Sequence, residues 1–131
     1  MSQTHLLDAN ALIAITLADH ECHERAVNWL ASIDRIALCP IVEGSLARFF
    51  VRLGQTPATV QQVLRALNDS PRCVFWPDSL SYTDAHMAHV IGHRQVTDAY
   101  LASLASANGG LLATFDHGLA RAFPQVVSLI P

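Results

Sequence analysis

The chain has 131 residues, of which 51% are hydrophobic, and its formal net charge at pH 7 is −3. This length suits one domain with a buried core and is too short for two, so we expect a single domain over residues 1–131. The sequence has no apolar run of about 18 residues that could span a bilayer, and no signal peptide at its start, so we expect a soluble, cytoplasmic protein without membrane contact.

Basic residues and cysteines exclude several classes of enzyme. All eight basic residues are arginines. Without lysine the chain can form neither a P-loop nor a Schiff base. The chain has three cysteines, Cys22, Cys39 and Cys73, and no CxxC pair. An odd number of widely spaced cysteines argues against a disulfide framework and against a thiolate metal site. We therefore expect ordinary reduced thiols.

Apolar runs that alternate with amphipathic segments predict strands and helices in turn. The predicted strands are residues 5–8, 36–39, 73–76, 111–115 and 126–130. The predicted helices are residues 9–18, 23–33, 41–53, 57–68 and 81–92, a helix that Thr97 caps and that ends at Asn108 and Gly109, and residues 117–122. This alternation predicts an α/β fold, a three-layer sandwich with a mostly parallel central sheet.

Four acids stand where a predicted strand ends or a predicted helix begins: Asp8, Glu43, Asp98 and Asp116. The carboxyl ends of parallel strands converge on one edge, so we expect one shared pocket. Two unit charges about 4 Å apart repel by roughly 4 kcal/mol at an effective dielectric of about 20, which calls for protonation or a bound cation. Each acid alone could be a turn residue or favour a helix start. Together they predict a nuclease that uses Mg²⁺, because hard ions prefer oxygen ligands and activate water against phosphodiesters.

Polar neighbours extend this predicted pocket. Thr114 lies on the same side of its strand as Asp116, where it could hold a water or a phosphate oxygen, or simply favour the strand. Asn10 follows Asp8 by two residues. Arg94, four residues before Asp98, is the arginine that we place nearest a substrate phosphate. Arg48 and Arg52 share a helix face that could guide RNA, bind an acidic partner or remain solvated. Without the four acids, seven acids face eight arginines, so the rest of the surface need not repel RNA.

Two groups of histidines allow a soft-metal site or an ordinary surface. His86, His89 and His93 fall at i, i+3 and i+7 of one predicted helix, so they could share a face and bind a metal ion. The segment DHECHE at residues 19–24 is also rich in metal-ligand types, but it straddles a loop and a helix start, where polar residues are expected.

Four segments carry a resemblance to a known family: LLDANALIAI at the start, Glu43 in the helix after the second strand, VTDAYLASLA around Asp98, and GGLLATFDHGL around Asp116. Over essentially its whole length the chain resembles the PIN-domain ribonucleases, in particular the VapC-type toxins of bacterial toxin–antitoxin pairs. The resemblance implies an endoribonuclease in which Asp8, Glu43, Asp98 and Asp116 surround one or two Mg²⁺ or Mn²⁺ ions. It also implies that Thr114 supports Asp116, that metal-activated water cleaves the phosphodiester, and that cleavage leaves a 5′-phosphate and a 3′-hydroxyl.

The resemblance also implies partners. Members of the family cut structured transfer or ribosomal RNA, usually form homodimers, and pair with an antitoxin whose tail enters the acidic groove. Exposed apolar surface must support these contacts. Trp29, Phe49, Phe50 and Trp76 are candidates for such a surface, or for the core.

Three rival interpretations differ in residues that can be checked. A haloacid-dehalogenase-type phosphatase requires a second Asp where Asn10 stands, and also a lysine. A phosphoacceptor receiver domain requires a lysine as well. A catalytically inactive PIN-like module that binds RNA or a partner without cutting remains the alternative, although the chain retains all four acids.

Overall fold

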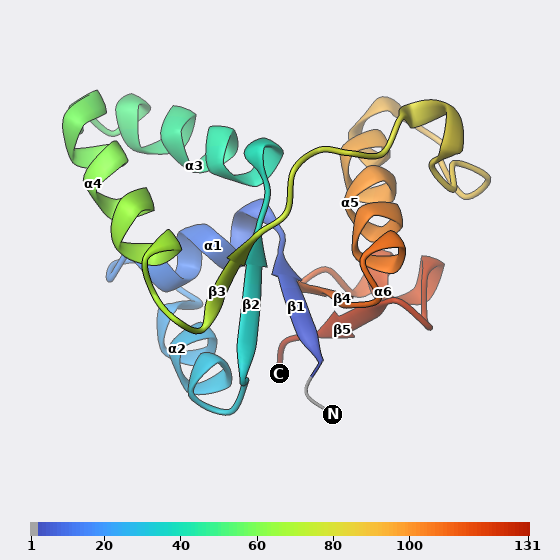
Figure 1. Cartoon of the computed structure of the whole chain (residues 1–131), viewed down its shortest axis with the longest axis horizontal. Coiled ribbons are helices and arrows are strands. Elements are labelled where there is room, and N and C mark those ends of the chain that lie inside the picture. Colours follow the sequence, from blue (N-terminus) through green and yellow to red (C-terminus); the bar gives the residue numbers. More distant parts are fainter. Residues whose placement is uncertain (1–2) are drawn as a thin grey trace.

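The computed structural model describes residues 3–131, which form a parallel sheet of five strands in the order β3-β2-β1-β4-β5 (Figure 1). The strands are β1 (Thr4–Leu7), β2 (Arg35–Leu38), β3 (Cys73–Phe75), β4 (Leu111–Thr114) and β5 (Val127–Leu129). The helices are α1 (Ala9–Thr16), α2 (His23–Ala31), α3 (Pro40–Arg52), α4 (Pro57–Asn68), α5 (Val96–Ala107) and α6 (His117–Ala122).

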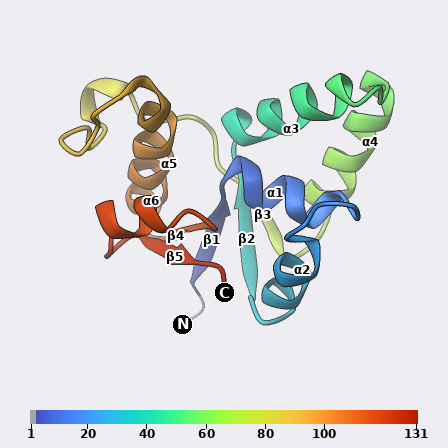
Figure 2. The same ribbon diagram turned by 180° about the vertical axis from the view of Figure 1, so that it is seen from behind.

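The strand order reverses direction at β1. The chain passes from β1 outward to β2 and β3, returns through a long connection over residues 76–95, and then builds β4 and β5 on the other side of β1 (Figures 1 and 2). The carboxyl ends of β1 and β4 therefore flank the topological switch point, where open parallel sheets bind their ligands.

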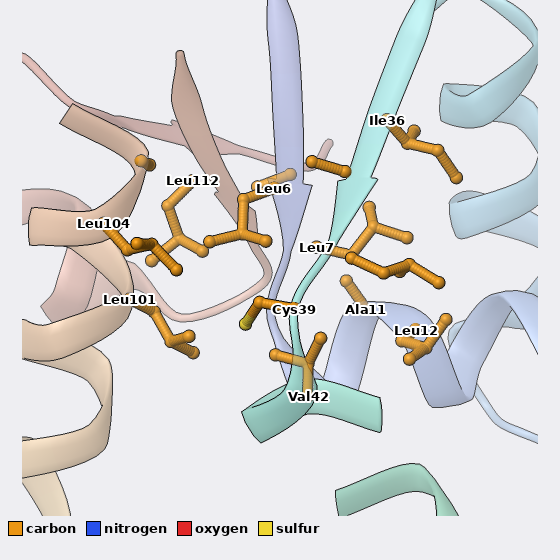
Figure 3. Close-up of a cluster of buried hydrophobic side chains, with 14 of the residues drawn as sticks. Leu6, Leu7, Ala11, Leu12, Ile36, Cys39, Val42, Leu101, Leu104 and Leu112 are labelled. Carbon is orange, nitrogen blue, oxygen red and sulfur yellow. The ribbon is translucent and has the colours of Figure 1, made fainter. Parts of the chain in front are cut away.

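Strand alternation divides the core between two helical layers. Leu6 of β1 is paired in register with Leu112 of β4, and both lie beside Leu104 of α5 (Figure 3). The next residue, Leu7, points to the opposite face of the sheet, where Leu12 of α1 lies. Each of these leucines is fully buried. The predicted three-layer sandwich with a parallel sheet is confirmed.

Two glycines close the turn from α5 into β4. Gly109 has φ of 70°, and the Gly110 N–H donates to the Ala105 carbonyl at 2.9 Å, which ends α5 in a Schellman motif. A Cβ on Gly110 would lie 2.6 Å from the Thr4 carbonyl oxygen and 2.7 Å from the Trp76 ring. Glycine is therefore required for the chain to enter β4 beside β1.

Most predicted elements are present, with ends that coincide or differ by at most two residues. The helix predicted to start after Thr97 instead begins at Val96, with Gln95 as its cap. The helix predicted over residues 81–92 is wrong, because this stretch holds only a short 3-10 turn at Tyr82–Asp84 and is otherwise irregular. Within the stretch the backbone forms only isolated three-residue turns, such as Val90 N–H to the Met87 carbonyl, whereas the His86 N–H donates to Ser103 Oγ of α5.

Of the two alternatives for the histidine groups, a soft-metal site is not formed among the described residues. Because residues 81–92 are not helical, His86, His89 and His93 do not share a helix face. In the stretch 19–24, His20 and His23 bond instead to Asn10 and to the Ala14 carbonyl. Across residues 3–131, no three His, Cys, Asp or Glu side chains stand close enough together to form a closed metal site.

The aromatic residues proposed for contacts pack in or against the core. Trp29 and Phe50 are buried, and Phe49 and Trp76 are partly buried against the same cluster. The large apolar side chains that are exposed lie elsewhere, with Ile91 the most exposed at 94%. Among the helices of the described residues, none is long and apolar enough to cross a membrane.

Candidate active site

A cavity of about 270 Å³ lies at the carboxyl ends of β1 and β4, at the switch point of the sheet. Its polar lining comes from both strands and from α5, and α3 closes the opposite side. The polar residues that line it are Asp8, Asn10, Thr97, Asp98, Thr114, Asp116 and Ser45.

Strand alternation places Asp8 and Thr114 together. Each follows by two residues a leucine that faces α5, so both side chains continue on that face. Asp8 is buried, and its Oδ1 accepts a hydrogen bond from the Ala11 N–H at 2.8 Å at the start of α1. Its Oδ2 accepts a short hydrogen bond from Thr114 Oγ1, which also accepts the Asp116 N–H at 3.0 Å. The fully buried Thr114 hydroxyl therefore ties the two strand ends together.

Asp98 enters the same cavity from the first turn of α5. Burial, followed by the negative charges of Asp8 and Asp116, raises the pKa of the Asp98 carboxyl to about 6. Burial also raises the pKa of Asp8, although the hydrogen bonds from Thr114 and Ala11 oppose the shift. In the metal-free protein the site therefore holds its protons to higher pH than isolated aspartates would, and a bound cation would compete with them.

The donor set fits a hard divalent cation held in an open site. The side chains that line the cavity offer carboxylate, hydroxyl and amide oxygens, and no sulfur or imidazole. The acids in the described residues do not close around a point as a preformed metal cluster would. Mg²⁺ suits this arrangement, because it keeps several waters and commonly binds through one or two carboxylates together with substrate phosphates.

Asn10 at the rim is oriented by a histidine that the sequence did not single out for this role. The Cys22 N–H donates to His20 Nδ1 at 3.0 Å, so the proton of the neutral ring lies on Nε2. That nitrogen is 3.1 Å from Asn10 Oδ1 and donates to it. The Asn10 amide nitrogen is therefore left to donate toward the cavity.

Glu43 is not brought to this cavity, in contrast to the sequence-based expectation. Its Oε2 accepts a hydrogen bond from Asn68 Nδ2 at 2.8 Å, and it lines a separate groove between α3 and α4. Burial and then the Glu43 charge raise the pKa of the Cys73 thiol in β3 to about 11, which also places this carboxylate on the β3 side.

The phase of α3 explains the difference. Pro40 is the first residue of the helix, and Ile41, Val42 and Ser45 then line the cavity. Residues two positions apart on a helix point in directions about 200° apart. Glu43 therefore faces away from the cavity that Ser45 lines. Ser45 was not expected in the pocket, because its place there depends on the rotation of α3 and not on its residue type.

Arg94 also lies outside the cavity. It sits in the 3-10 turn His93–Gln95, is exposed, and is not part of the lining. The arginine linked to the lining is Arg48, whose Nη2 donates to Ser45 Oγ at 3.2 Å. The sequence grouped Arg48 with Arg52 as a possible RNA guide, and its spacing of three from Ser45 is the signal that connects it to the site.

Fold and site together define an α/β domain that gathers strand-end carboxylates at the switch point of a parallel sheet. The family model for the PIN domain matches residues 5–123. The chain therefore belongs to the PIN-domain family.

Curated relatives match nearly the whole chain. It is 50% identical over 129 residues to Ribonuclease VapC29 of Mycobacterium tuberculosis, covering 98% of this chain and 97% of that protein. It is 35% identical over 125 residues to Ribonuclease VapC38 of Mycobacterium tuberculosis, covering 87% and 86% of the two chains.

Solved structures share the fold at low sequence identity. The crystal structure of VapBC2 from Rickettsia felis bound to a promoter DNA fragment aligns with a TM-score of 0.67 at 18% identity, covering 98% of this chain and 99% of that chain. The crystal structure of FitAcB from Neisseria gonorrhoeae aligns with a TM-score of 0.60 at 23% identity, covering 93% and 94%.

Proposed function

We propose that this protein is a metal-dependent endoribonuclease and the toxin of a bacterial toxin–antitoxin pair. The observation that carries the proposal is the convergence of Asp8, Asp98 and Asp116 on one cavity at the switch point of the sheet. The 50% identity to a protein named as a ribonuclease, over 98% of this chain, supports the same activity.

The chain's residues would hold Mg²⁺, with Mn²⁺ as a possible substitute, through Asp8, Asp98 and Asp116. When bound, such an ion lowers the pKa of water and offsets charge on the phosphoryl group. Asp8 is held in place by Ala11 and Thr114, so it offers a fixed anchor. In the metal-free protein burial raises the pKa of the Asp98 carboxyl to about 6, so a bound cation would displace its proton and Asp98 would then serve as a ligand.

Neither a lysine nor a buried cysteine thiol offers a nucleophile for a covalent intermediate. The chain has no lysine, and burial raises the pKa of both the Cys39 and Cys73 thiols to about 11, so neither is a thiolate at neutral pH. Water would then be the nucleophile, and the amide nitrogen of Asn10 can donate to a phosphate oxygen. Attack by water on phosphorus with the O3′ oxygen as the leaving group would leave a 5′-phosphate and a 3′-hydroxyl, the products that the family resemblance implies.

The proposed substrate is structured transfer or ribosomal RNA, and the proposed partners are a cognate antitoxin and a second copy of this chain. The resemblance to VapC-type toxins supports the antitoxin, and the structures that share the fold include VapBC2 of Rickettsia felis and FitAcB of Neisseria gonorrhoeae. An inactive RNA-binding or partner-binding module is the second candidate, and the same experiment separates the two.

The test is incubation of the purified full chain with transfer and ribosomal RNA in Mg²⁺, in Mn²⁺ and in excess chelator, followed by sequencing of the new 5′ ends. We expect cleavage at defined positions with either metal and none with chelator. Asp98→Asn should remove cleavage, whereas Asp34→Asn, at an exposed acid just before β2, should not. Binding of RNA without cleavage would favour the inactive module, and cleavage that persists in chelator would contradict the metal mechanism.

A further inference from the structure

A second cavity, of about 130 Å³, adjoins the acidic one. The two share Asp98 and Asp116, so a ligand that reaches these carboxylates can extend into either. Beyond the shared acids its wall changes character, because Val90, Ala99, Leu119 and Phe123 line it together with His89 and Gln95. This second cavity is formed where the loop before α5 meets α6.

Two rings, those of His89 and Phe123, form part of the wall of this cavity. The His89 ring meets the Phe123 ring edge-on, with ring centroids 5.5 Å apart and planes at 80°. Phe123 caps the end of α6 and packs partly buried against the core. A planar ring could therefore contact these side chains without a rearrangement of the fold.

Gln95 adds an oriented hydrogen-bond donor. Its Oε1 accepts from the Ile91 N–H at 2.6 Å and from the Gly92 N–H at 3.4 Å. Because two backbone N–H groups donate to this atom, it must be the amide oxygen and the other atom the amide nitrogen. The Gln95 Nε2 group therefore remains free to donate to a ligand.

We propose that this second cavity, the base pocket, receives an unstacked nucleobase of the RNA next to the phosphate that is cleaved. The inference rests on the proposed function and names the part of the substrate that a second site reads. A nucleobase is flat, uncharged and rich in acceptors along its edge, which matches an aromatic wall with one amide donor. Sequence-specific RNA recognition commonly works in this way, with splayed bases against aromatic side chains and hydrogen bonds to their edges.

The place of the base pocket beside the acids determines which nucleotide of the RNA, relative to the cleaved bond, can put its base there. Because both cavities meet at Asp98 and Asp116, the base in the pocket and the phosphate at the acids belong to the same or the adjacent nucleotide. The enzyme would therefore show a base preference at one position beside the cleaved bond, and the acidic cavity itself would contribute little to that preference.

A binding experiment tests the pocket without cleavage. Side-chain signals of Val90, Leu119 and Phe123 are followed by NMR in Mg²⁺ while AMP, CMP, GMP or UMP is added, with ribose 5-phosphate as the ligand that lacks a base. We expect at least one nucleotide to shift these signals and ribose 5-phosphate to leave them unchanged. Phe123→Leu should weaken the binding of that nucleotide by about fivefold or more, given the usual strength of base–aromatic stacking. Equal shifts with ribose 5-phosphate, or no shift with any nucleotide, would overturn the proposal.

Matched variants extend the test to cleavage of an RNA pool randomised around its cut site. Gln95→Glu keeps the oxygen that holds Ile91 and removes the donor, so it should change the base preference beside the cut. Phe75→Leu, at an exposed aromatic of β3 far from the pocket in sheet order, should change neither preference nor rate.

The outcomes separate the base pocket from the proposed function. An unchanged base preference in both Gln95→Glu and Phe123→Leu, with normal cleavage, overturns the pocket alone. A variant that alters antitoxin binding and no step of RNA binding or cleavage would also overturn it, in favour of a protein side chain. If the wild type cuts no RNA, the proposed function fails, and the nucleotide titration still decides whether the pocket binds a base.

Discussion

The acids at the ends of β1 and β4 and the acid at the start of α3 look equivalent in the sequence and differ in the structure. Asp8 and Asp116 are brought to one cavity, whereas Glu43 turns to the groove between α3 and α4. The difference teaches how each kind of element places a side chain. A strand has two faces, so a residue at the end of a buried strand has few alternatives; a helix rotates by about 100° per residue, so a two-residue offset changes the face.

The two regions also differ in how their charges are satisfied. In the acidic cavity, burial and neighbouring carboxylates raise the pKa of Asp98 to about 6, so the charged form lacks a counter-charge. Glu43 accepts a hydrogen bond from the neutral amide of Asn68, and none of the other three acids lines its groove. The cation that we propose would therefore offset charge in the first region, whereas the second region offers it no comparable group of carboxylates.

The largest expected effect is a contrast in cleavage rate. Asp98→Asn removes a carboxylate of the proposed cation site, and we expect cleavage to fall by about 100-fold or more, since changes even behind metal ligands commonly cost 10- to 100-fold. Glu43→Gln can keep the hydrogen bond from Asn68 and should retain cleavage to within about twofold. Initial rates on the same RNA at saturating Mg²⁺ measure both. Equal losses in the two variants would contradict the placement of Glu43 outside the site.

The sequence predicted what depends on local pattern. The fold class and the strand ends at Asp8 and Asp116 follow from apolar runs and alternation. Alternation placed Thr114 on the side of Asp116, whereas its hydrogen bond to Asp8 was not predicted. The rotation of α3 decides whether Glu43 or Ser45 faces the cavity. That rotation depends on the residue at which α3 begins, and a start one residue earlier or later would change it.

Contacts across the chain were beyond the sequence. Residues 81–92 resemble a helix by composition, yet some of their backbone donors bond to side chains of α5 and of the turn before it, as His86 does to Ser103. The bond between His20 and Asn10 likewise joins residues ten apart whose approach depends on the path after α1. Neither contact leaves a local pattern that could have been read in advance.

A second prediction exploits the helical phase by moving an acid onto the cavity side of α3. Ser45→Glu adds a carboxylate where Ser45 now lines the cavity, and more ligand charge generally raises divalent-cation affinity. We expect Mg²⁺ or Mn²⁺ to bind about tenfold more tightly, as measured by isothermal titration calorimetry. Gln61→Glu, on the α4 side of the Glu43 groove, is the matched control and should leave metal affinity unchanged. Unaltered affinity in Ser45→Glu would argue against the cavity as the cation site.

A third prediction concerns the stability of the metal-free protein. The folded pKa of Asp98, about 6, lies above its ordinary value of 3.8, so between these pH values the folded state retains a proton that the unfolded state has already lost. The free energy of unfolding therefore falls as the pH rises from about 4 to about 6, and the loss then stays constant. Asp98→Asn removes this loss.

Measured by urea unfolding in chelator at pH 7.5, Asp98→Asn should be more stable than the wild type by about 1.5 kcal/mol, a value reduced for the partial exposure of the carboxyl. The two should converge near pH 4. Saturating Mg²⁺ should reverse the order, because it stabilises only the folded protein that binds it. A metal-free variant less stable than the wild type at pH 7.5 would show that Asp98 is not under electrostatic strain.

The smallest expected effect lies on the α3–α4 side. Asn68 Nδ2 donates to Glu43 Oε2 and, at 3.0 Å, to the Leu64 carbonyl. Asn68→Ala removes both bonds and should lower the free energy of unfolding by about 1 kcal/mol, with cleavage unchanged. Asn68→Asp should lower it further at neutral pH, because a second carboxylate then faces Glu43, and the added loss should disappear when both are protonated. A fall in cleavage that exceeds the fall in folded fraction would mean that the Glu43 side of α3 is coupled to the acidic cavity.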